Sequence, residues 1–300
     1  MIPEPGAAFN TIAAAIAERT GTRFSPRSVS PVGGGSIHRA WHIDDGSRHY
    51  FVKTNALAAA PMFAAEAQGL QALAAAAAVP APTVVTLGEA GDQCFLVLDY
   101  LDLAALDREG GARLGAALAR LHRVSGDTFG WPDDNFIGAT PQHNAAHASW
   151  PHFFGERRLR PQLQLARQNG MDKALAAKGD AVIERVGGLF IDYRPAPSLL
   201  HGDLWSGNAA QSRDGAPVIF DPACYYGDRE TDLAMTELFG GFPASFYAAY
   251  RAAWPLDSGY EMRKPLYNLY HVLNHFNLFG SAYLGQVQRM IEGLLKQLRR

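Results

Sequence analysis

Apolar and polar positions along the first hundred residues predict a small antiparallel sheet. Five short runs with apolar, aromatic or β-branched centres are bounded by turn-forming residues, and they span residues 28–32, 40–43, 49–53, 83–87 and 94–98. Between the third and fourth runs, the alanine- and leucine-rich segment 58–78 favours a helix that ends before Pro80. A separate helix is expected at the N-terminus. After it, the five strands and the helix at 58–78 follow the order β-β-β-α-β-β.

Beyond residue 101 the pattern becomes mainly helical. Residues 112–122 form the clearest amphipathic segment, and further helices are expected from residue 153 to the C-terminus. The stretch 126–149 is rich in Pro, Asn, Asp and Gly and is expected to be a long ordered loop. We therefore predict an α+β chain of two lobes, with a small sheet-and-helix lobe at 1–101 and a larger, mainly helical lobe at 102–300.

Composition narrows the class of protein. The chain of 300 residues is 48% hydrophobic and 19% charged, which is typical of a soluble globular protein large enough for two lobes around a cleft. Its net charge of -2 supplies no field that attracts nucleic acid. Cys94 and Cys224 match no metal-binding spacing, and the apolar run 72–78 is too short to span a bilayer. We expect a cytoplasmic monomer with no membrane partner.

One motif carries chemistry. The sequence LHGDLWSGN at residues 200–208 is followed by an apolar strand at 218–220, which ends in Asp221. Asp203 and Asn208 are five positions apart, the spacing of the kinase catalytic loop H-R-D-x-x-x-x-N. Asp203 would accept the proton of an acceptor hydroxyl or orient that hydroxyl, and the oxygens of Asn208 and Asp221 would bind Mg²⁺.

The same residue types also cap ordinary turns. The tripeptide His201-Gly202-Asp203 alone is as compatible with a turn as with a catalytic loop, because Asp and Gly are common there. A catalytic loop is favoured once Asn208, the apolar strand and Asp221 follow in that order.

The N-terminal lobe offers the parts that bind a nucleotide. A glycine-rich turn lies between the first two strands and would let backbone amides approach phosphates; its residues are Gly33, Gly34, Gly35 and Ser36. The turn departs from the protein-kinase G-x-G-x-x-G pattern at His38, and a flexible turn without a ligand is the alternative.

Two further features complete the predicted ATP site. Lys53 and Glu66 are placed to form an ion pair that aims the lysine at phosphates, although in isolation each residue type is more often solvent-exposed. The strand at 94–98 leads into the expected hinge, whose backbone would bind adenine; its residues are Asp99, Tyr100 and Leu101. ATP and Mg²⁺ are the expected cofactors.

Taken along the whole chain, these motifs resemble the fructosamine kinase (ketosamine-3-kinase) family, a relative of aminoglycoside phosphotransferases and choline kinases. The most specific pair is HGDLWSGN at 201–208 with DPACYYGDRE at 221–230. The resemblance implies a protein-kinase-like fold and transfer of the γ-phosphate of ATP to the 3-hydroxyl of a ketosamine, either free or protein-bound. The resemblance further implies that phosphorylation makes the adduct unstable, so that the sugar leaves and the amine is restored, which would be a deglycation repair activity.

The resemblance also suggests substrate contacts. Trp205 would supply a face for the sugar, or it packs within the lobe. Asp228 and Glu230 would bind the substrate's ammonium group, or they stabilise their own loop. Arg229 is the expected partner of these two acids. Some relatives carry cysteine where this chain has Ser36, so thiol control of the glycine-rich turn is not expected.

The remaining histidines receive structural roles at this stage. His201 is expected to orient the catalytic loop, because Asp203 already serves as the base. The helical histidines are expected to be core or surface residues; they are His122, His271 and His275.

Two other functions stay open on the sequence. A kinase of the same fold could act on another hydroxyl compound, such as an aminoglycoside, an amino alcohol or a free sugar. A nucleotide-binding pseudokinase scaffold is the alternative from a different class, and the full set of catalytic side chains argues against it.

Overall fold

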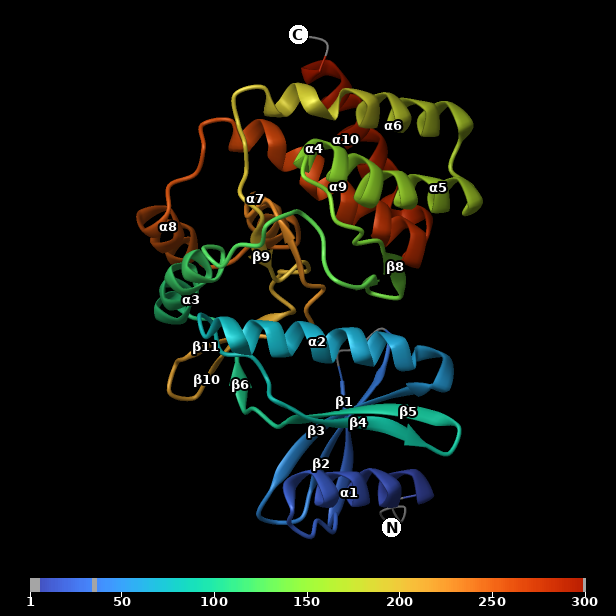
Figure 1. Cartoon of the computed structure of the whole chain (residues 1–300), viewed down its shortest axis with the longest axis vertical. Helices are drawn as coiled ribbons and strands as arrows, with labels where there is room; N and C mark the ends of the chain where they lie inside the picture. The colour runs from blue at the N-terminus through green and yellow to red at the C-terminus, as the bar shows by residue number, and fades with distance from the viewer. Residues whose placement is uncertain (1–5, 34–36, 299–300) are drawn as a thin grey trace.

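The N-terminal lobe is built on a five-stranded antiparallel sheet with one helix on each face (Figure 1). The computed structural model describes residues 6–33 and 37–298. The strand order is β1-β2-β3-β5-β4. The elements of this lobe are α1 (Ala7–Thr20), β1 (Ser28–Val32), β2 (Arg39–Asp44), β3 (His49–Ala56), α2 (Ala60–Ala76), β4 (Val84–Ala90) and β5 (Gln93–Asp99).

The apolar residues of β5 explain why helices cover both faces of the sheet. Phe95 and Val97 pack in the cluster that contains Ile12 and Ile16 of α1. On the opposite face, alternate residues of β5 pack in the cluster that contains Phe63 of α2. The predicted order β-β-β-α-β-β is confirmed, although β3 continues past Lys53 to Ala56, so the lysine lies within the strand and not at its end.

The C-terminal lobe is mainly helical and is joined to the first by the segment after β5 (Figure 1). Its strands are β6 (Leu103–Ala104), β7 (Asn135–Ile137), β8 (Thr140–Gln142), β9 (Ser198–Leu200), β10 (Ala209–Ser212), β11 (Pro217–Ile219) and β12 (Tyr225–Gly227). Its α-helices are α3 (Arg108–Leu121), α4 (Trp150–Phe153), α5 (Arg160–Gln168), α6 (Lys173–Arg185), α7 (Glu230–Leu238), α8 (Ala244–Ala253), α9 (Tyr260–Phe279) and α10 (Leu284–Gln297). A π-helical segment, η2 (Phe154–Leu159), joins α4 to α5, and two 3₁₀ turns are η3 (Val186–Phe190) and η4 (Ser281–Tyr283).

The stretch 126–149 is not a loop throughout, because β7 and β8 form a hairpin within it. Asn135 pairs with Gln142 across the hairpin, and the Gln142 side chain donates a 2.8 Å hydrogen bond to Asn135 Oδ1. The two strands are only three residues long, Asn-Phe-Ile and Thr-Pro-Gln, which is too short for the apolar alternation that marks a strand, so the pattern did not predict them.

The two lobes meet where β5 ends at Asp99 and β6 begins at Leu103, and the predicted boundary near residue 101 lies between them. The division of the chain into domains at residues 101 and 102 stays a prediction. Within residues 6–33 and 37–298, none of the helices combines the length and the apolar character needed to cross a bilayer.

Candidate active site

A cleft of about 710 Å³ lies between the lobes and is lined by residues from both. Of the residues predicted from the sequence, those that line it are Gly33, Lys53, Glu66, Asp99, Tyr100, Leu101, Asp203, Trp205, Asn208 and Asp221. Gly34, Gly35 and Ser36 fall outside the described residues. Positions from Gly33 to Asp221 therefore converge on one cavity.

Lys53 is the buried cation of the cleft. Its Nζ lies 2.7 Å from Glu66 Oε1 and 2.5 Å from Asp221 Oδ1. Burial alone would lower the pKa of Lys53, but the two carboxylates outweigh that effect and raise it. The lysine is thus held charged, with its ammonium group aimed at the junction between the lobes.

The loop 201–208, which the sequence predicts to be the catalytic loop, contains a glycine in a left-handed conformation. Gly202 has a φ of 85°, and a Cβ atom there would lie 2.1 Å from the carbonyl oxygen of Ala223. The backbone N–H of Ala223 donates a 2.8 Å hydrogen bond to the His201 carbonyl, which fixes this close approach. Any side chain at 202 would therefore force apart the two backbone segments beside Asp203.

Asp232 anchors the same loop from α7. Its carboxylate accepts hydrogen bonds from the backbone N–H groups of His201 (2.7 Å) and Gly202 (2.9 Å). His122 Nε2 of the segment after α3 lies 3.2 Å from the same carboxylate. Burial would raise the pKa of Asp232, but its hydrogen bonds and the nearby histidines lower it, so the anchor stays ionised.

His201 itself lies beneath the loop, as expected from the sequence. Its Nε2 is 2.9 Å from the Phe220 carbonyl, and burial lowers the pKa of the ring. A buried neutral imidazole bonded to backbone has an orienting role.

The hairpin β10–β11 brings Asn208 and Asp221 together. Ala209 pairs with Ile219, and the Phe220 N–H donates a 3.0 Å hydrogen bond to the Asn208 carbonyl. Asp221 follows with a φ of 57°, a conformation that is unusual for a residue with a side chain. Its side chain is 47% exposed and faces the cleft.

Asp203 lies next to both residues. Asn208 Nδ2 donates hydrogen bonds to the Asp203 carbonyl (2.9 Å) and to its Oδ2 (3.2 Å). Burial, together with repulsion from Asp221, raises the pKa of Asp203 to about 7. A carboxyl group with that pKa is suited to accept a proton near neutral pH.

Trp205 lies at the mouth of the cleft with 37% of its surface exposed. Its ring covers Gly207, since a Cβ atom at that glycine would lie 2.3 Å from the indole. Phe239 contacts the indole edge-on, with ring centroids 6.3 Å apart. The ring is therefore held by Gly207 and Phe239, while more than a third of the residue's surface stays accessible beside the cleft.

Helix α9 contributes residues that the sequence pattern did not single out. His275, Leu278 and Phe279 lie near the C-terminal end of this helix and line the cleft. His271 Nδ1 lies 4.0 Å from Asp203 Oδ1, and burial lowers the pKa of this imidazole to about 3, so it is neutral beside the carboxyl group. These histidines occur at ordinary helical spacing, which carries no signal of a site.

Asp228 does not line the cleft. It is fully buried and accepts hydrogen bonds from Tyr267 (2.5 Å) and Tyr193 (3.0 Å). These contacts support the loop-stabilising alternative and not the substrate contact expected from the resemblance.

The expected partnership of Arg229 is also wrong. Glu230 binds Arg263 at 2.8 Å, whereas the Arg229 guanidinium lies 4.0 Å from the Trp254 ring centroid and donates to the Pro255 carbonyl. The acidic run after β12 is thus part of the core of the C-terminal lobe.

The two-lobed fold and this arrangement of side chains define a kinase-like phosphotransferase. The model of the fructosamine kinase family matches residues 8–297. The chain belongs to this family.

Individual relatives agree over nearly the whole chain. A probable ketoamine kinase from Synechocystis is 47% identical over 294 residues, which cover 97% of this chain and 98% of the relative. The chloroplastic protein-ribulosamine 3-kinase of Arabidopsis thaliana is 41% identical over 90% of this chain and 83% of its own.

Solved structures share the fold. The crystal structure of a fructosamine-3-kinase homologue from Haemophilus somnus covers 96% of this chain and 98% of its own, at 31% identity and a TM-score of 0.88. An aminoglycoside phosphotransferase at 18% identity and a choline kinase at 15% identity share the fold alone, with TM-scores of 0.60 and 0.64. The resemblance inferred from the sequence motifs is confirmed.

Proposed function

We propose that this chain transfers the γ-phosphoryl group of ATP to the 3-hydroxyl of a ketosamine. The observation that carries the proposal is the convergence of Asp203, Asn208 and Asp221 opposite Lys53 in one cleft. Relatives named as ketoamine and ribulosamine kinases at 41–47% identity support the substrate class. An aminoglycoside phosphotransferase of the same fold was crystallised with ADP, which agrees with a nucleotide in this cleft.

The side chains around Asp221 fit a magnesium ion. Both side-chain hydrogen bonds of Asn208 within the described residues use Nδ2, which leaves Oδ1 available as a ligand. The exposed carboxylate of Asp221 supplies a second hard oxygen, the ligand type that Mg²⁺ prefers. When bound, the ion would offset the charge of the phosphates.

Asp203 performs the proton transfer. The acceptor hydroxyl oxygen attacks the γ-phosphorus, the bond from phosphorus to the β–γ bridging oxygen breaks, and ADP leaves. The hydroxyl proton passes to the Asp203 carboxylate, whose raised pKa suits it to hold that proton. Lys53, fixed by Glu66, stabilises negative charge on the phosphates.

The exposed part of the Trp205 ring orients the sugar. Carbohydrate C–H groups pack well on aromatic rings, and the ring lies two residues from the catalytic base. The sugar would then present its hydroxyl to Asp203 while the amine end extends out of the cleft. Loss of the phosphorylated sugar from the amine completes a deglycation.

A substrate panel tests the proposal. The protein is incubated with ATP, Mg²⁺ and lysines carrying ribulosamine, erythrulosamine or fructosamine, and products are weighed by mass spectrometry. A gain of one phosphate, located at the 3-hydroxyl by NMR and absent with Asp203→Asn, is the expected result. Phosphorylation of an aminoglycoside, amino alcohol or free sugar in preference to every ketosamine would contradict the substrate class, and absence of any ADP formation would contradict catalysis.

We extend the proposal to a monomer in the cytoplasm. Cys94 and Cys224 are free, buried thiols, as expected in a reducing compartment. Light scattering on the purified chain tests the monomer.

A further inference from the structure

Three metal-ligating side chains meet on the β2–β3 hairpin, apart from the catalytic residues. His42 and Asp44 belong to β2, and His49 belongs to β3, where it pairs directly with Asp44. Because alternate residues of a strand project from the same face and paired residues share a face, all three side chains point the same way. One ligand atom from each lies within 4.8 Å of the other two.

The two imidazoles already have the spacing that a metal ion requires. His42 Nε2 lies 3.1 Å from His49 Nδ1, and the rings are nearly parallel at 3°. Around a tetrahedral ion with metal–nitrogen bonds of roughly 2.0–2.1 Å, two ligand nitrogens lie about 3.3 Å apart. We propose that His42, Asp44 and His49 form a binding site for a divalent transition-metal ion, which would replace the hydrogen bond between the two rings.

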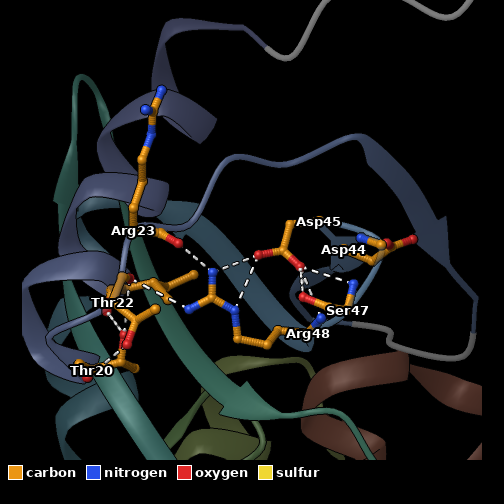
Figure 2. A network of polar contacts seen from close by, with 9 residues as sticks. Thr20, Thr22, Arg23, Asp44, Asp45, Ser47 and Arg48 are labelled. Carbon is orange, nitrogen blue, oxygen red and sulfur yellow. Dashed lines mark hydrogen bonds and ion pairs between the residues drawn. The ribbon is translucent and has the colours of Figure 1, made fainter.

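A network of polar contacts fixes the turn that carries these ligands (Figure 2). The Arg48 guanidinium binds the Asp45 carboxylate at 2.6 Å and also donates to backbone carbonyls of Thr22 and Arg23. Asp45 Oδ1 in turn accepts hydrogen bonds from Ser47, including one of 2.8 Å from its hydroxyl. The hairpin is therefore held in the register that places Asp44 opposite His49.

Asp44 is itself oriented by hydrogen bonds. Ser28 Oγ donates a 2.9 Å hydrogen bond to Asp44 Oδ2, and the Gly46 N–H donates to Oδ1. These bonds lower the pKa of Asp44, so the ligand is an anion at neutral pH. Each oxygen keeps a lone pair for a metal ion, in the way that hydrogen-bonded carboxylates serve as ligands elsewhere.

The ligand set selects the kind of ion. Two imidazoles and one carboxylate suit Zn²⁺, Ni²⁺ or Cu²⁺, whereas Mg²⁺ prefers oxygen ligands only. The site would therefore discriminate against the ion that fits Asn208 and Asp221. Its existence does not depend on which hydroxyl compound the enzyme phosphorylates.

The position of the site connects it to the nucleotide cleft. On the same sheet face, Ala40 of β2 and Phe51 and Lys53 of β3 line the cleft. The ring of His42 contacts that of Tyr100 in the hinge, with centroids 4.2 Å apart. The site thus lies on the continuation of the cleft's sheet wall, beside the hinge.

Calorimetric titration of tag-free, nucleotide-free protein with Ni²⁺ tests the proposal. Millimolar Mg²⁺ is present to occupy the oxygen ligands of the cleft. The expected result is one Ni²⁺ bound per chain, with affinity lowered at least about 10-fold by His49→Ala and also lowered by Asp44→Asn. Circular dichroism checks that both variants keep the fold.

His152→Ala is the matched control. His147 and His152 form a second stacked histidine pair, with ring centroids 4.1 Å apart, and no third ligand joins that pair into a cluster among the described residues. The affinity of the His152→Ala variant for Ni²⁺ should equal that of the unmodified protein. The proposal is overturned if the unmodified protein binds no Ni²⁺, or if His49→Ala binds it as tightly as His152→Ala.

Discussion

The ammonium group of Lys53 lies 2.5 Å from the carboxylate of Asp221, although 168 positions separate the two residues. Lys53 belongs to the sheet of the N-terminal lobe, and Asp221 follows the hairpin β10–β11 of the C-terminal lobe. Their contact therefore depends on the arrangement of the two lobes relative to each other. It also places a cation where phosphates and a metal ion would meet.

Replacing this cation should impair catalysis without affecting the acceptor site. For Lys53→Met we expect kcat/KM for ATP to fall roughly 10²–10³-fold, because a preorganised charge facing the phosphates is lost. Lys178→Met is the control, since Lys178 forms an exposed ion pair with Glu292 and neither residue lines the cleft. Steady-state kinetics measures kcat/KM for both variants. Equal values would show that Lys53 does not contribute to the active site.

The pKa of Asp203 predicts the pH dependence of the reaction. Burial and repulsion from Asp221 raise it to about 7, so the carboxyl group of the free enzyme is increasingly protonated below that pH. A protonated base accepts no proton, and kcat/KM should therefore fall about tenfold per pH unit below 7 and level off above it. For Asp203→Asn, kcat should be lower by roughly 10²–10⁴-fold, with no titration in this range. A pH profile that is the same in both proteins would show that another group is the base.

Asp228 provides a test of the acidic run after β12. Asp228→Asn should cost about 1–3 kcal/mol in the free energy of unfolding, because a buried tyrosine hydroxyl loses a carboxylate acceptor. The KM for a ketosamine should stay within about twofold, since the residue lies outside the cleft. Urea unfolding measures the loss of stability and steady-state kinetics measures KM. A large rise in KM would indicate that Asp228 contributes to substrate binding.

The sequence predicted the parts of the fold and site that depend on local pattern. The five strands and α2 follow from apolar runs and alanine content, and Asp203, Asn208 and Asp221 follow from their spacing. The roles of Asp232 and His271 could not be predicted in this way. Asp232 anchors a loop thirty residues away in sequence, and His271 reaches Asp203 from a long helix, so only the packing of the lobe shows them.

Asp232 is expected to act on turnover through the catalytic loop. In Asp232→Asn, a carboxamide replaces the carboxylate that faces two backbone N–H groups, so one N–H loses its acceptor at a cost of about 1–3 kcal/mol. We expect kcat to fall while the dissociation constant for nucleotide is unchanged, because Lys53 and the hinge lie in the other lobe. Asp228→Asn is the matched control, with a similar loss of stability and no loss of kcat; equal kcat in both variants would contradict the anchoring role.

Metal binding on the β2–β3 hairpin should change the affinity of the hinge region for a nucleoside. His42 is a ligand of the proposed site and also packs on Tyr100, which lines the cleft, so an ion that fixes the imidazole restrains the tyrosine ring. Adenosine is the suitable probe, because it occupies the hinge region without phosphates that would chelate the metal. Its dissociation constant should differ by about 5-fold or more with and without Ni²⁺, as is typical of coupled sites, and adenosine must change the affinity for Ni²⁺ by the same factor. His49→Ala should remove the difference, whereas His152→Ala should retain it. Independent binding in the unmodified protein would show that the effect of the ion ends at the hairpin.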